Sequence, residues 1–147
     1  MATAKRTRPS RTASSRLTLD EALIALFLAA MNANDHVAVD EAARAHHLIW
    51  STRRFRDRAG EMVGRLIERM RRLVEASDPP AVIKRAARSI PARLRPSAFA
   101  VVVDLLLADG TLERRERRFL QQLGAELKLA PDMVDRIMKV VALKNAL

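Results

Sequence analysis

The stretch Phe99–Glu116, which reads FAVVVDLLLADGTLERRE, decides how the fold of this sequence is interpreted. Its apolar run ends in Ala108-Asp109-Gly110, and Glu116 follows seven residues after the aspartate. We interpret the run as a helix over 97–108, a turn, and a second helix over 113–127. Apolar residues at helical spacing place one face of that second helix in a core: Leu112, Phe119, Leu120, Leu123 and Leu127.

The same periodicity recurs outward in both directions from this stretch. Thr18 and Glu21 form a capping-box pattern before an apolar run, and Asp78 precedes two prolines that suit a first helical turn. No alternating strand pattern is found. The sequence therefore predicts an all-α fold, a single bundle of about seven helices, over 19–33, 39–53, 56–75, 81–88, 97–108, 113–127 and from 131 onward.

An internal repeat accompanies this pattern. A shift of 75 residues aligns Ala33 with Ala108, Val37 with Leu112, and Glu41 with Glu116. Duplicated helical hairpins of this kind bury one continuous core between neighbouring copies. The repeat predicts two pseudo-repeated helical hairpins that close over the same core.

The composition limits the class of protein. The chain has 147 residues, enough for one domain with its own core, and it lacks cysteine, which excludes disulfides and thiolate sites. Its longest apolar run, Ala22 to Met31, has ten residues, half of the roughly 20 that a membrane-spanning helix needs. We expect a cytoplasmic protein.

The charge is strongly positive, at +10, with 27 Lys and Arg against 17 Asp and Glu. Residues 1–16 carry no acid, so we predict a disordered basic N-terminal tail followed by a helical domain over 17–147. A basic surface attracts nucleic acid or anionic membrane, although charge runs are often merely solvated faces. The cations proposed for an anion or nucleic-acid surface are Arg6, Arg8, Arg11, Arg114, Arg115 and Arg118.

Asp109 and Glu116 allow two interpretations. As capping residues, both would accept hydrogen bonds from backbone amides around the turn. As ligands, they would hold a hard divalent cation together with carbonyl oxygens and water. The upstream copy offers Asn34, Asp35 and Glu41 as a second, weaker set. Asp104, inside the apolar helix, is five residues from Asp109 and is expected in an ion pair or facing solvent.

No catalytic arrangement is recognised in the sequence. His46 and His47 are adjacent and diverge on a helix, whereas zinc sites favour a spacing of four residues. Neither a nucleophile–base pair nor a glycine-rich phosphate loop occurs. We predict that the protein is not an enzyme and has no small-molecule substrate.

The Ala-Asp-Gly turn, Leu112, Glu116 and the later segment KLAPDMV at 128–134 resemble the tellurite-resistance TerB family over roughly residues 18–145. The resemblance implies an all-α bundle without established catalysis, associated with stress, metal and tellurite responses. It implies a divalent cation, Ca²⁺ or Mg²⁺, at Asp109 and Glu116. It also implies protein partners in a stress-response complex. The basic tail separately suggests peripheral attachment to an anionic membrane surface, at the inner membrane. The upstream copy departs from the family pattern at Asn34 and Asp35.

Overall fold

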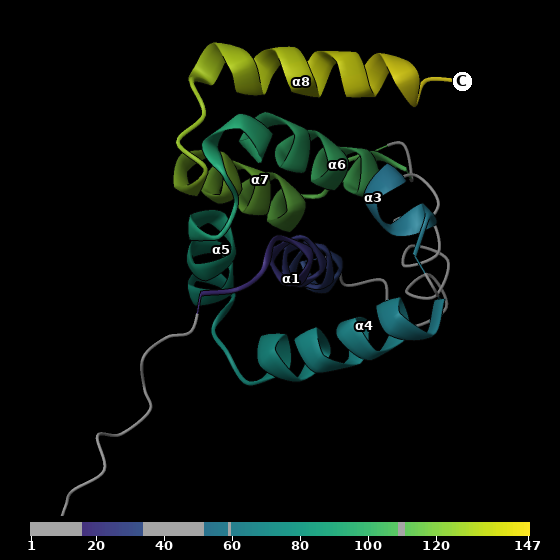
Figure 1. Ribbon diagram of the computed structural model, residues 1–147. Helices are drawn as coiled ribbons and strands as arrows, with labels where there is room; N and C mark the ends of the chain where they lie inside the picture. Colours follow the sequence, from purple (N-terminus) through teal and green to yellow (C-terminus); the bar gives the residue numbers. More distant parts are fainter. Residues whose placement is uncertain (1–15, 34–51, 59, 109–110) are drawn as a thin grey trace, which may run out of the picture.

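The computed structural model describes residues 16–33, 52–58, 60–108 and 111–147, and these form helices and connecting turns without a strand. This confirms the predicted all-α class. The elements, labelled in Figure 1, are α1 (Leu19–Asn32), α3 (Arg53–Arg56), α4 (Gly60–Glu75), α5 (Pro79–Arg88), the 3₁₀ turn η1 (Ala92–Leu94), α6 (Arg95–Leu107), α7 (Arg114–Glu126) and α8 (Pro131–Lys144).

Helix α1 lies at the centre of the bundle and packs against α4, α5 and α6 (Figure 1). Its residues from Ile24 to Met31 are all buried, as expected for a helix that is apolar on every side. The Glu21 backbone N–H donates to Thr18 Oγ1 at 3.2 Å, which confirms Thr18 as the N-cap. The central helix therefore begins where its cap predicts.

Helix α8 covers the opposite side of α6 and forms the outermost layer in Figure 1. Its apolar stripe faces inward, since Val141 is buried and Val134, Ile137 and Met138 pack against the core. Gly124 of α7 makes this approach close, because a Cβ there would lie 3.3 Å from Val134 Cγ2. The apolar stripe of α8 and the absence of a side chain at Gly124 together allow α8 to pack closely against the bundle.

The predicted starts of three helices are wrong. The helix expected over 56–75 begins only at Gly60, as α4, and Arg53–Arg56 form the separate short helix α3. The Asp20 carboxylate of α1 pairs with Arg54 of α3 and with Arg58, which follows α3. These contacts hold α3 against α1, so that α3 does not continue into α4. Helices α5 and α6 also begin earlier than expected, because prolines at their first turns need no backbone N–H there.

Several predictions fall on residues outside those that the structure describes. These include the tail at 1–15, most of the helix expected over 39–53, and the turn of the upstream repeat. The pseudo-repeat therefore stays a prediction. Among the described helices, none is both long and apolar enough to cross a bilayer.

Candidate functional site

The turn between α6 and α7 carries the first candidate site. Helix α6 ends at Leu107 with Ala108 as its C-cap, and the described chain resumes at Thr111. Glu113 is the N-cap of α7 and takes part in a capping box with Glu116 three residues later. Asp109 and Gly110 lie outside the described residues, so the structure positions the second half of the motif.

The side chain of Glu116 is buried where the turn packs against the core. It is 1% exposed and is the only buried charged residue among those described. The Glu113 backbone N–H donates to Glu116 Oε1 at 3.0 Å, which is the contact that the capping interpretation expects. A carboxylate in the first turn of a helix also lies at the positive end of the helix dipole. Burial of this charge is therefore compensated in part by the helix that it caps.

The fit of a divalent cation depends on which oxygens the turn can supply. Glu116 offers carboxylate oxygens, the donors that Ca²⁺ and Mg²⁺ prefer. Within the described segments, no group of three or more His, Cys, Asp or Glu side chains forms a metal cluster. A cation here would thus need Asp109, backbone carbonyls and water besides Glu116. The site predicted at Asp109 and Glu116 stays a prediction, as does the weaker set of Asn34, Asp35 and Glu41, which lies outside the described residues.

The predicted anion surface is only half described. Arg114, Arg115 and Arg118 are exposed in the first part of α7, while Arg6, Arg8 and Arg11 lie outside the described residues. Nearby, Arg117 Nε donates to the Leu112 carbonyl at 3.4 Å. The arginines of α7 therefore add positive charge next to the turn that holds Glu116, and this charge lowers the attraction of the turn for a cation.

Asp104 has a structural role away from this turn. Its Oδ1 accepts from Lys144 Nζ at 2.7 Å and from Asn145 Nδ2 at 2.9 Å. The expected ion pair is confirmed, and it links α6 to the end of α8. The charge inside the apolar run of α6 is thereby explained without a ligand.

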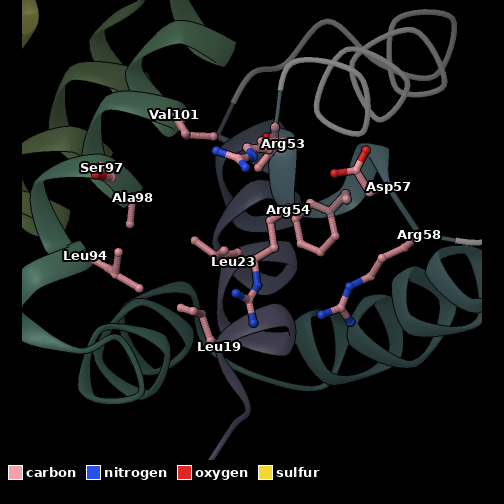
Figure 2. A pocket seen from close by; sticks show the side chains of 12 residues that line it. Leu19, Leu23, Arg53, Arg54, Asp57, Arg58, Leu94, Ser97, Ala98 and Val101 are labelled. Atoms are coloured by element: carbon pink, nitrogen blue, oxygen red, sulfur yellow. The ribbon is translucent and has the colours of Figure 1, made fainter.

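A cleft of about 780 Å³ between α1, α3 and α6 was not predicted from the sequence. Its apolar lining comes from α1, η1 and α6 and from Phe55 of α3. Its charged lining consists of Arg53 and Arg54 of α3 with Asp57 and Arg58 directly after that helix. No periodicity in the sequence brings these separated segments together. Figure 2 shows Leu94, Ala98 and Val101 on one side of the cleft and Arg53 and Arg54 on the other, with Leu19 and Leu23 between them.

The chemistry of this cleft is amphipathic. Leu23 and Val101 are half-buried, so an apolar group seated there would cover them. Arg54 and Arg58 already pair with Asp20, whereas Arg53 is exposed and forms no ion pair with a carboxylate of the described chain. The cleft can accept an apolar group that carries a negative charge beside Arg53.

Comparisons with known proteins agree with the motif. The family model described as "Tellurite resistance protein TerB" matches residues 20–139, which is 120 of the 147 residues. Neither the curated proteins nor the solved structures give a significant match. The matched range includes α1 through most of α8, and with them the whole Ala-Asp-Gly turn. The chain belongs to the TerB family of tellurite-resistance proteins.

Proposed function

We propose that this tellurite-resistance-type domain is a non-catalytic interaction domain of a stress response, and that it binds a divalent cation at the α6–α7 turn. The observation that carries the cation proposal is the buried carboxylate of Glu116, directly after the Ala-Asp-Gly motif. The absence of catalysis rests on the sequence, which holds no cysteine and no recognisable nucleophile–base pair.

Glu116 and Asp109 have distinct roles in this proposal. Glu116 is fixed at the first turn of α7 by the Glu113 amide, so its carboxylate is oriented before a cation arrives. Asp109 would supply the second carboxylate. Two carboxylates with carbonyls and water give fewer charged ligands than a strong Ca²⁺ loop, and affinity depends on that number. We therefore expect weak binding that acts as a sensor of raised cation concentration.

Calorimetric titration with Ca²⁺ and with Mg²⁺ tests this site on the full chain, its Asp109→Asn and Glu116→Gln variants, and Glu75→Gln as a control. The glutamine introduced by Glu116→Gln keeps a side-chain oxygen that can accept from the Glu113 amide, so the variant removes the charge and preserves the cap. Glu75 is exposed at the end of α4 and loses the same charge.

We expect saturable binding in the wild type and in Glu75→Gln, with loss in both turn variants. Absence of saturable binding in the wild type contradicts the proposal. So does wild-type affinity in Glu116→Gln, because it would leave Glu116 as a capping residue only.

We assign the interaction role to the cleft of Figure 2, with a partner segment whose apolar side chain is flanked by an acidic residue. The apolar lining would cover that side chain, and Arg53 would meet the charge. Anilinonaphthalene sulfonate combines the same two features and serves as the probe. Val101→Glu should abolish its fluorescence enhancement, whereas Val140→Glu on the outer face of α8, where Val140 is 64% exposed, should not.

Comparison of Val101→Glu with Val140→Glu distinguishes dye binding in the cleft from dye binding to exposed apolar residues elsewhere on the surface. Equal enhancement in Val101→Glu and the wild type would show that the dye binds elsewhere and would remove the cleft from the proposal. Far-UV circular dichroism of both variants checks that each retains its helices.

A further inference from the structure

A second cleft, of about 740 Å³, lies where α5 meets the segment before α1 and the end of α7. Its volume is in the range of small-molecule sites. One carboxylate, Glu126, lines it. The cations that line it are Arg16, Lys84, Arg85, Arg88, Arg95 and Lys128.

Most of this positive charge is not neutralised by a carboxylate of the described residues. Within the described chain, Arg16, Lys84, Arg88, Arg95 and Lys128 form no ion pair with a carboxylate. By contrast, Asp20, Glu21 and Asp104 elsewhere all pair with cations. Charges of one sign in a cleft with low-dielectric walls reinforce one another and attract counter-ions. The cleft therefore attracts anions.

Two of its arginines are held by the backbone. Arg16 donates one Nη2 bond to the Arg88 carbonyl at 3.0 Å, and Arg95 donates through Nε to the Ile90 carbonyl at 3.2 Å. A guanidinium has five N–H donors, so each retains donors for a ligand. The contacts fix the side chains without neutralising them, which reduces the ordering cost of binding.

Lys128 stands at a position that favours glycine. Its φ is 55°, and it is the only residue other than glycine with a positive φ in the described chain. It ends α7 in a Schellman arrangement, in which the Lys128 N–H donates to the Ala125 carbonyl and the Leu129 N–H to the Gly124 carbonyl, both at 3.0 Å. A lysine in this conformation is less stable than glycine, yet its charge is placed in the cleft.

We propose that this cleft binds phosphate groups. Arginine forks match phosphate oxygens in two parallel hydrogen bonds, and lysine adds a point charge. Six cations against one carboxylate suit a ligand with several negative charges, such as a diphosphate or a phosphomonoester. The phosphate can come from a soluble molecule or from a lipid headgroup. The proposal does not depend on the cation site at the α6–α7 turn.

Binding is tested on the full chain with pyrophosphate by calorimetry, and with vesicles of phosphatidic acid or of phosphatidylcholine by sedimentation. The cleft variants are Lys84→Gln with Arg88→Gln, and Lys128→Gly. The matched control is Arg136→Gln with Lys139→Gln, which removes two exposed cations from α8. Lys128→Arg keeps both the charge and the backbone conformation.

We expect pyrophosphate to bind the wild type, the α8 control and Lys128→Arg with similar affinity. Loss of a charge-assisted contact should weaken binding about tenfold or more in each cleft variant. Vesicle binding that requires phosphatidic acid and is lost in the cleft variants identifies a headgroup as the source. Binding of pyrophosphate without vesicle binding identifies a soluble phosphate.

Two results would overturn the proposal. One is the absence of saturable binding to both pyrophosphate and phosphatidic acid vesicles. The other is an equal loss in the cleft and α8 double variants, because affinity would then follow net charge alone. The folded state of each variant is checked by its unfolding transition, and Lys128→Gly in particular should remain folded because glycine suits its backbone.

Discussion

Lys128 adds positive charge to a surface cleft, and its backbone conformation lowers the stability of the fold. The turn after α7 needs a positive φ, and glycine meets that need without a steric cost. A lysine there gains only a favourable interaction with the negative end of the helix dipole. The position thus couples local strain to the charge of the phosphate cleft.

Replacement of Lys128 by glycine should raise the free energy of unfolding by about 0.5–1 kcal/mol, the strain relieved less the lost dipole interaction. Urea denaturation of the wild type and Lys128→Gly measures this change. Lys128→Ala is the control, since it loses the charge but keeps a Cβ in the strained conformation and should not be stabilised. A destabilised glycine variant would contradict the account of strain.

At the scale of single residues, contacts could be predicted from the sequence where both partners are close together in the chain. Thr18 was expected to bond a backbone amide a few residues away, and the capping interpretation expected the same of Glu116; both contacts are present. Asp104 was expected in an ion pair or facing solvent, and its ion-pair partner, Lys144, is 40 residues distant. Spacing along a helix fixes the first kind of contact, whereas the second depends on how α6 and α8 pack.

At the scale of elements, two glycines inside helices have opposite surroundings. Gly64 is in the middle of α4, and a Cβ there meets nothing within 4 Å. Gly124 is buried in α7, where a Cβ would lie 3.3 Å from Val134 and 3.7 Å from the Phe99 ring. The first weakens its helix, and the second permits α7 to approach α6 and α8.

Leucine at each position should therefore have opposite effects. Gly64→Leu should stabilise the protein by about 0.5–1 kcal/mol because leucine favours helix. Gly124→Leu should destabilise it by about 1–3 kcal/mol because the side chain overfills a packed site. Thermal unfolding of both variants checks the pair. A stable Gly124→Leu protein would show that α8 can move away from α7 at little cost.

The elements themselves could be predicted from periodicity, because the core-facing stripes of α4, α7 and α8 follow the helical repeat. Their boundaries could not be predicted where contacts between distant segments determine where a helix begins. The break between α3 and α4 is stabilised by Asp20 pairs with Arg54 and Arg58 across the bundle. Local sequence around residue 57 gives no sign of that contact.

At the scale of the whole molecule, both clefts are made by segments far apart in the sequence. The phosphate cleft combines Arg16 with Lys84 and Lys128, and the apolar cleft combines α1, α3 and α6. The composition predicted a basic surface, but the cations proposed for that surface lie in the N-terminal tail and within Arg114–Arg118. Which cations share one cleft depends on the packing of α5 against α7, which no single stretch encodes.

The central claim concerns the cation at the α6–α7 turn, and thermal unfolding with and without Ca²⁺ tests it most directly. A ligand at tenfold its dissociation constant stabilises the folded state by about 1.4 kcal/mol. The account predicts that Ca²⁺ raises the Tm of the wild type and of Glu75→Gln and leaves that of Glu116→Gln unchanged. An equal rise in all three proteins, or none in the wild type, would contradict it.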